Sequence, residues 1–426
     1  MAPTESTDGT TATVGCPHSE LEAQPETEFD LSDPAFITDP AAGERWLSAP
    51  RPICRGRFAD GMPIWVVTRY ADVKAVLSDP RFASKPPGDL HVQSMLARGI
   101  PEDIVEMFDS TVLTMDGPDH ARVRRLVTGA LSARRVRSLR SGIERIATEL
   151  LDKMDPGGEV DLIAELAHPL AIAVICELLG VDERYREQWR QWSETLAAAL
   201  RPDPEQLAPA VRGMAAVTRE LIEARRAHPE DDLISELVGV HEADGDRLTD
   251  DELVAMAMVL VQAGHDTVRN LICLGVHTLL DHPEQAELLR AEPDRTARAV
   301  AELVRYTAPV KHTFRRFATE PVRLGEITVA QGEAVQIVLA AANRDPEQFT
   351  EPGELDLARP DNPHLGFGHG PHYCLGAALA LNEAEIAINL LLRRHPGLRR
   401  AAPAEEVAPR YLLPMEKLPV YLEETR

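Results

Sequence analysis

One cysteine near the C-terminus lies in a glycine-rich run of residues that constrains both the backbone around it and the chemistry of its thiol. Cys374 belongs to the run FGHGPHYCLG, residues 367–376, in which three glycines surround the thiol at fixed offsets. A helix-like run, residues 377–392, follows directly. The pattern predicts a thiolate on a tight turn at a helix start, where peptide N–H groups and the helix dipole lower its pKa. A buried intracellular cysteine is more often structural, but this frame favours a ligand that gives a metal an anionic sulfur.

A long amphipathic pattern predicts a helix that crosses an entire domain. Residues 249–252 read Thr-Asp-Asp-Glu, which is a capping box at a helix start. The apolar pattern continues to Leu280, and residues 281–283, Asp-His-Pro, end it. The helix therefore has about thirty residues and a length of roughly 45 Å. Its middle reads AGHDT, residues 263–267, where the Thr267 hydroxyl can bond back to the carbonyl four residues earlier.

Both stretches resemble motifs of the cytochrome P-450 family. Residues 367–376 carry the anchors of its haem-thiolate signature, and residues 263–267 are similar to its oxygen-activation motif. The resemblance implies that Cys374 is the axial ligand of the iron of haem b, where a thiolate favours O–O cleavage. Family members more often carry Glu where this chain has Asp266, so the acid here is one methylene shorter.

The resemblance also assigns roles to the residues around the cysteine. Phe367 is expected to pack near the haem on the side of the thiolate. Gly368 and Gly370 would let the backbone approach the sulfur because they have no Cβ. Gly376 would let the following helix lie close under the haem.

On the opposite side of the haem, the resemblance implies a site for dioxygen. Gly264 weakens the long helix, and the small Ala263 leaves room for dioxygen. Thr267 would compete with the helical hydrogen bonds, open a groove and steady the oxygen, while Asp266 relays protons from solvent. Taken alone, Thr and Asp inside a helix are usually a back-bonded side chain and a surface carboxylate. For His265 there are two alternatives: a donor to the substrate or a proton shuttle, and a ring that faces away from the haem toward neighbouring helices. The second is expected.

Haem carries two propionates, whose burial requires cations or strong hydrogen-bond donors. Four residues match the positions that the family uses for this purpose. His120 and Arg124 share one helix face at i and i+4. Arg316 begins a strand-like segment, and His372 comes from the cysteine run. A single arginine is usually a solvated surface charge, so the prediction depends on all four positions together.

Glu302 and Arg305 lie one helical turn apart and predict a structural ion pair. They resemble the Glu-x-x-Arg element of the family, which ties a helix to the loop that leads to the cysteine. The family often adds a basic third partner before the cysteine run, but the nearest match here is the acid Glu354. Arg359 or a backbone group is expected to replace that partner.

Composition excludes several classes of protein. The chain of 426 residues has 45 basic and 69 acidic side chains, a formal net charge of −24, which argues against a nucleic-acid binder. Its five cysteines have no paired spacing, which fits a reducing cytoplasm better than a disulfide framework. No secretory leader and no apolar stretch long enough to span a bilayer is visible. We therefore expect a soluble cytoplasmic protein with no membrane contact, of the bacterial branch of the family.

The chain is expected to form one large domain, residues 29–426, after a disordered tail, residues 1–28, that is poor in apolar residues. The predicted class is mainly α with small β-sheets (α+β), the cytochrome P-450 fold. Residues 117–310 read as successive helices, and a helical segment is predicted for residues 70–77. The strand candidates are residues 63–69, 313–317, 326–329 and 334–339.

A basic segment suggests how electrons arrive. Residues 122–145 contain eight arginines and one acid in an otherwise acidic chain. This arginine island either docks an acidic ferredoxin or is a solvated helix face that partly binds haem. No flavin or nicotinamide fingerprint is present, so a separate ferredoxin reductase is expected.

The sequence thus predicts a monomeric haem-thiolate monooxygenase that hydroxylates or epoxidises a small molecule with O2, in antibiotic or other secondary-metabolite biosynthesis. The alternatives are a peroxygenase and a non-catalytic member that recruits partner proteins. Relatives of those kinds tend to lose the acid–alcohol pair or the thiolate, and both are present. Few aromatic residues occur in the expected pocket segments, which favours an aliphatic, polyketide-like or macrolide-like substrate. Those segments are residues 86–108, 192–207, 258–263, 310–314 and 412–415.

Overall fold

The long helix predicted from its capping box is the central element of the molecule. Helix α12 (Asp250–Asp281) begins after Thr249, whose hydroxyl accepts from the Glu252 amide at 3.2 Å. The Glu252 carboxylate accepts from the Thr249 amide at 2.8 Å, so the box is complete. The helix ends at the predicted place because Pro283, two residues on, has no amide hydrogen to continue it. Its buried side chains lie all round its axis, as expected of a helix enclosed by others.

The computed structural model describes residues 29–30, 51–58, 61–86, 88–97, 99–197, 203–239, 247–403, 407 and 415–423. The predicted disordered tail, residues 1–28, and residues 412–414 of the last expected pocket segment lie outside these ranges.

Helices make up most of the described chain, as predicted. Those that pack against α12 include α8 (His168–Leu179), α9 (Arg186–Ala197), α10 (Pro204–Ala227), α13 (Pro283–Ala291), α14 (Thr296–Thr307) and α16 (Ala377–Arg394). Helices α5 (Glu102–Asp109) and α11 (Leu233–Gly239) also contact α12. Further helices include α3 (Tyr70–Ser78), α4 (Leu90–Ala97), α6 (Gly117–Ala130), α7 (Ala133–Lys153) and α15 (Leu339–Ala342). A single π-helical turn, η1 (Ile163–Ala167), leads directly into α8.

The largest sheet has the strand order β1-β2-β3-β9-β6-β4. Its strands are β1 (Phe29–Asp30), β2 (Cys54–Arg57), β3 (Pro63–Val67), β9 (Ala334–Ile337), β6 (Arg316–Ala318) and β4 (Phe82–Ala83). Two smaller sheets contain β10 (Arg399–Arg400), β11 (Pro419–Tyr421) and β5 (Glu159–Asp161), and β7 (Val322–Leu324) and β8 (Ile327–Val329). Strand β9 pairs parallel with β3 and antiparallel with β6, with Arg316 opposite Val335. This pairing fixes the place of Arg316 in the fold.

All four strand candidates contain a strand, but their ends differ from the prediction. The first stops at Val67 because Arg69 is the N-cap of α3. The second begins only at Arg316, after His312 has made an isolated bridge to Val338. Strand ends depend on the partner strand, which sequence patterns do not reveal.

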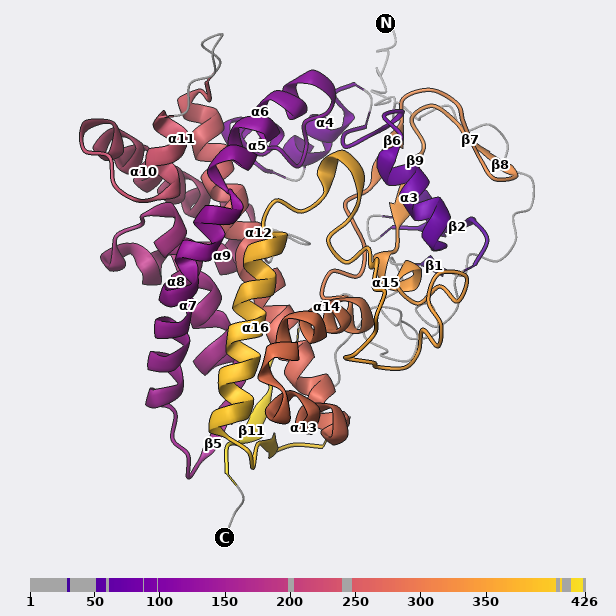
Figure 1. Cartoon of the computed structure of the whole chain (residues 1–426). Helices are drawn as coiled ribbons and strands as arrows, with labels where there is room; N and C mark the ends of the chain where they lie inside the picture. Colours follow the sequence, from indigo (N-terminus) through magenta and orange to yellow (C-terminus); the bar gives the residue numbers. More distant parts are fainter. Residues whose placement is uncertain are drawn as a thin grey trace, which may run out of the picture.

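Helices and strands occupy different parts of the molecule. Figure 1 shows α7, α8, α12 and α16 running through the helical part, and the strands of the main sheet gathered on the other side. One large apolar cluster joins the helices, and two smaller clusters lie on the sheet. Among the described residues, no helix is both long and apolar enough to cross a membrane.

Candidate active site

The cysteine run forms the tight turn that the sequence predicts. A short 3-10 turn, η5 (Gly370–His372), precedes Cys374, whose amide donates to the Phe367 carbonyl at 2.9 Å. Gly368 and Gly370 have φ of 73° and 70°, which favours glycine. A Cβ on Gly370 would lie 2.6 Å from the Leu77 carbonyl oxygen. Gly370 therefore lets the loop approach the end of α3, a contact that the sequence did not indicate.

The Cys374 thiol lies at the start of α16, with hydrogen bonds from the amides of Gly376 and Ala377. Burial raises the pKa of Cys374, while these amides and the nearby Arg124 lower it, and burial has the larger effect. The amides at the helix start thus lower the pKa of Cys374 as predicted, although burial outweighs them. Because a coordinated metal deprotonates a thiol outright, the amides and Arg124 stabilise the anion once iron is bound.

The four residues predicted for the propionates come together from three segments far apart in the sequence. The rings of His120 and His372 lie with centroids 4.1 Å apart. Arg316 donates to the Ser84 hydroxyl, and His372 Nε2 lies 3.3 Å from the same oxygen. Arg124 donates to the Tyr373 carbonyl, directly before the cysteine.

Asp116 and Ser84 complete this cluster and were missed by the sequence analysis. Asp116 Oδ2 accepts from the Ser84 amide at 2.7 Å, and its Oδ1 lies 3.5 Å from His372 Nε2 and 4.0 Å from Arg316 Nη1. Burial raises the pKa of Asp116, but His372, Ser84 and Arg316 outweigh it and hold that pKa below its usual value. One feature of the sequence could have indicated Asp116: it lies at the start of α6, four residues before His120.

The cluster fits the two carboxylates of haem. His120 is buried, and among the described residues its Nε2 has no hydrogen-bond partner. Burial, with the charges of His372 and Arg124, lowers the pKa of His120 to about 4. Burial likewise lowers the pKa of Arg316, whose only described anionic neighbour within ion-pair distance is Asp116. The cluster therefore has more buried hydrogen-bond donors than acceptors. Such a site is suited to bind further anions, such as the two haem carboxylates.

On α12, the acid–alcohol pair has part of the predicted geometry. Thr267 Oγ1 donates to the Ala263 carbonyl at 2.5 Å, as predicted. The helix nevertheless continues without a break through these residues, so no groove opens in this state. Ala263 is exposed although most of the surrounding helix is buried. Gly264 also has a packing role, since a Cβ there would lie 3.2 Å from Ile175 Cδ1 on α8.

Asp266 is a carboxyl group that holds its proton more tightly than usual. Burial raises its pKa, and the charge of Arg269 opposes this effect. The two side chains form an ion pair with Arg269 Nη2 3.4 Å from Asp266 Oδ1. A carboxyl with a raised pKa exchanges its proton at a higher pH than an ordinary aspartate does, which suits a proton donor in catalysis.

His265 faces away from the site, as expected. Its ring is fully buried between α12, α8 and α9, and its Nδ1 lies 3.1 Å from the Ser193 hydroxyl. The ring of His168 on α8 lies 4.3 Å away between centroids.

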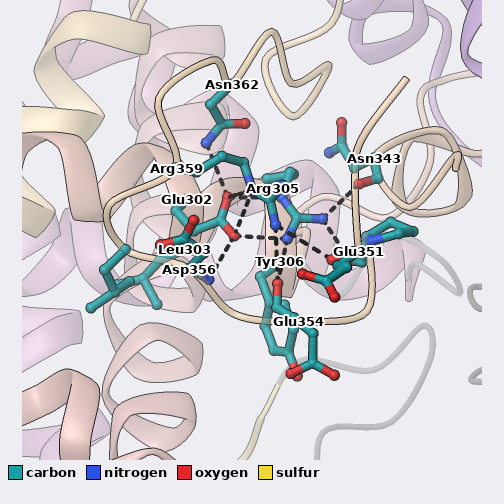
Figure 2. A network of polar contacts seen from close by, with 12 residues as sticks. Glu302, Leu303, Arg305, Tyr306, Asn343, Glu351, Glu354, Asp356, Arg359 and Asn362 are labelled. Carbon is teal, nitrogen blue, oxygen red and sulfur yellow. Dashed lines mark hydrogen bonds and ion pairs between the residues drawn. The ribbon is translucent and has the colours of Figure 1, made fainter. Parts of the chain in front are cut away.

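A buried polar network joins α14 to the loop that leads to the cysteine (Figure 2). Arg305 is bound by the Glu302 carboxylate at 2.7 and 2.8 Å. Arg359 Nε lies 3.2 Å from both oxygens of Glu302, so Arg359 is the third partner. Glu354 contributes only its backbone carbonyl, which accepts from Arg305 at 2.9 Å. Both substitutes that the sequence analysis allowed for the missing basic partner are therefore present.

Among the described residues, four of the eight arginines of the island form ion pairs with acids. These pairs include Arg122–Glu252, Arg135–Glu236, Arg140–Glu385 and Arg145–Glu177. Arg134 and Arg137 are exposed on α7, and within the described residues they form no ion pair. The sequence therefore overstated the free positive charge of this segment.

Comparison with known proteins agrees with this site. The family model of cytochrome P-450 matches residues 181–396. The 6-deoxyerythronolide B hydroxylase of Saccharopolyspora erythraea is 39% identical over 401 residues, which cover 92% of this chain and 98% of that protein. The chain belongs to the cytochrome P-450 family. Its cofactor is haem with an axial cysteine thiolate, and it is a monooxygenase of the bacterial secondary-metabolite type.

Other relatives and solved structures agree with this family assignment. The mycinamicin IV hydroxylase/epoxidase of Micromonospora griseorubida is 39% identical over 363 residues, 85% of this chain and 89% of that protein. Among solved structures, the cytochrome P-450 PksS of the Bacillus subtilis 168 bacillaene polyketide synthase superposes with a TM-score of 0.84 at 34% identity. That match covers 93% of this chain and 100% of that one, and it confirms the predicted fold class.

Proposed function

We propose that this cytochrome P-450 inserts one oxygen atom of O2 into a C–H or C=C bond of a polyketide-like or macrolide-like metabolite. Electrons would come from a ferredoxin and its reductase in the cytoplasm. The observation that carries the proposal is the convergence of His120, Arg124, Arg316 and His372 beside Cys374. The names of relatives that act on macrolides support the substrate class.

Each residue then has a role in binding or proton movement. Cys374 is the axial ligand, and Phe367, Gly368 and Gly376 shape its loop. His120, Arg124, Arg316 and His372 bind the propionates. When bound, the haem supplies the iron that activates O2 for transfer of one oxygen atom.

On α12, the small Ala263 would leave room for dioxygen, and Gly264 lets this helix pack against Ile175 of α8. With haem bound, the Thr267 hydroxyl would donate a hydrogen bond toward the dioxygen site once it leaves the Ala263 carbonyl, and Asp266 would supply protons there. A peroxygenase or a recruiting protein has less use for these two side chains, so the complete pair favours the monooxygenase.

The substrate is found by its effect on the iron. A library of macrolide, polyketide and unrelated aliphatic compounds is screened for the low-to-high spin shift of the ferric protein. Hits are then tested for oxidation that requires NADH, ferredoxin and reductase. A spin shift that only the unrelated aliphatic compounds produce would contradict the proposed substrate class. Oxidation that occurs only with hydrogen peroxide would favour the peroxygenase.

A Thr267→Ala variant tests the role of the hydroxyl. We expect hydrogen peroxide release to rise and product formed per NADH to fall by about tenfold or more, because proton donors of this kind contribute about 10²–10⁴ in rate. A Thr267→Ser variant keeps the hydroxyl and is the matched control. Equal product yield in Thr267→Ala and wild type would show that another donor, such as a substrate hydroxyl, has this role.

Exchange of Arg134 and Arg137 for glutamate tests the docking of ferredoxin. These two exposed charges are free to meet an acidic partner, whereas Arg135 is bound to Glu236. The reduction rate should fall about tenfold at low salt, within the usual range of electrostatic steering, and substrate affinity should not change. Arg323→Glu is the control, because Arg323 is the exposed residue of β7, in the separate two-stranded sheet. Unchanged reduction kinetics would place the docking surface elsewhere.

A further inference from the structure

The proposed reaction needs a supply of protons at a buried carboxyl. Inserting one atom of O2 and releasing the other as water consumes two electrons and two protons for each substrate molecule. The electrons come from the ferredoxin, but the protons must come from solvent through the protein. Asp266 is the acid to which the proposed mechanism assigns this supply, and its side chain is 26% exposed. Its neighbour Arg269 forms an ion pair with it and is thus a charge partner, so the protons are expected to arrive through other residues.

Behind Asp266 lies a group of buried side chains that the proposed mechanism does not yet use. His265 Nδ1 lies 3.6 Å from Asp266 Oδ1 and 3.1 Å from the Ser193 hydroxyl. The ring of His168 is next, 4.3 Å from that of His265 between centroids. His168 Nε2 lies 3.5 Å from Glu194 Oε1.

This group ends at the surface. The Glu194 side chain is 45% exposed, whereas those of His265 and His168 are 1% and 11% exposed. Glu194 is held at the surface by Arg190, which donates to it at 2.6 Å. The residues come from α12, α8 and α9, three helices in mutual contact. They therefore line one route from the surface to the acid, in which Glu194, His168 and His265 each lie close to the next group but, among the described residues, form no direct hydrogen bond with it.

Two features of the path are hard to explain by packing alone. Within the described residues, Nε2 of both histidines is buried without a hydrogen-bond partner, which normally costs stability. His168 also follows the single π-helical turn η1, and such turns occur frequently at functional sites. Burial, with the charges of Arg269 and Arg190, lowers the pKa of His265 to about 3 and also lowers that of His168. Both rings are thus neutral and can accept a proton on one nitrogen while releasing it from the other.

We propose that Glu194, His168 and His265 form a relay that carries protons from solvent to Asp266 during oxygen activation. Ser193 orients the His265 ring through its hydroxyl. The histidines are positioning and transfer residues, because none of them touches the site of oxygen insertion. This inference rests on the proposed monooxygenase function.

His168→Phe removes the middle of the path while it keeps an aromatic ring of similar size. NADH-driven turnover should fall about tenfold and its solvent deuterium isotope effect should rise, because proton transfer becomes rate-limiting. Product formed per NADH should stay near the wild-type value, unlike in Thr267→Ala. Turnover with hydrogen peroxide should not change, since peroxide brings its oxygen already reduced and protonated.

A second measurement does not depend on turnover. In protein labelled with ¹⁵N-histidine, in the ferrous carbon-monoxide form, the ring N–H of His265 should exchange with D2O about tenfold more slowly in His168→Phe. The matched control is His277→Phe, another buried histidine of α12, which pairs with Asp281. If His168→Phe folds poorly, Glu194→Gln tests the exposed end with little risk to the core.

The outcomes separate the two proposals. Slower exchange together with slower, fully coupled turnover supports the relay. Unchanged exchange and unchanged isotope effect in His168→Phe and Glu194→Gln would overturn it and show that Asp266 takes protons directly from water. Absence of NADH-driven oxidation in the wild-type protein would instead overturn the proposed function, while the exchange measurement would still test the path.

Discussion

A Cys374→Ser variant is expected to lose the absorption band that a thiolate gives to the ferrous carbon-monoxide complex, and to lose turnover by more than about 100-fold. Even groups one step removed from a metal ligand change activity by about 10–100-fold, and here the ligand itself is removed. A serine hydroxyl is not deprotonated as readily and donates much less electron density to iron. The amides of Gly376 and Ala377 would remain in place, so the loop should keep its shape.

Cys54→Ser is the control for this experiment, because Cys54 is a partly exposed thiol on β2, in the sheet rather than at the site. We expect its spectrum and turnover to match the wild-type protein. A thiolate band that persists in Cys374→Ser would mean that another cysteine is the ligand.

Exchange of Glu302 for alanine is expected to lower the free energy of unfolding by about 3–5 kcal/mol, the usual cost of leaving a buried charge without its partner. Arg305 and Arg359 are 0% and 8% exposed, and both would lose the one carboxylate that lies close to them among the described residues. Urea denaturation followed by circular dichroism and haem absorbance measures this cost. Haem should be lost early, because the network ties α14 to the loop before the cysteine.

Two control variants distinguish the loss of a buried ion pair from the loss of any negative charge. Glu354→Ala should change stability by less than about 0.5 kcal/mol, because only the backbone carbonyl of Glu354 is used. Glu236→Ala removes a partly exposed partner of Arg135 and should cost at most about 1 kcal/mol. Equal losses in all three variants would contradict the structural role assigned to Glu302.

Sequence reasoning worked where the determining interactions are local. The ends of α12 followed from a capping box and a proline, and the back-bond of Thr267 followed from a spacing of four residues. The i, i+3 pair of Glu302 and Arg305 was likewise visible.

Interactions between distant segments were largely invisible. The acids that neutralise Arg122, Arg135 and Arg140 lie 130, 101 and 245 residues further along the chain, so a count of arginines overstated the free charge. Ser84 and Asp116 became neighbours only through the fold. The net pKa of the Cys374 thiol depends on burial, which a motif does not measure.

The origin of the inserted oxygen tests the central claim most directly. With ¹⁸O2, NADH, ferredoxin, reductase and the compound that gives the largest spin shift, mass spectrometry should find one ¹⁸O atom in each product molecule. A product that carries no label from ¹⁸O2, or that forms only with hydrogen peroxide, would contradict the assignment as an oxygen-inserting monooxygenase.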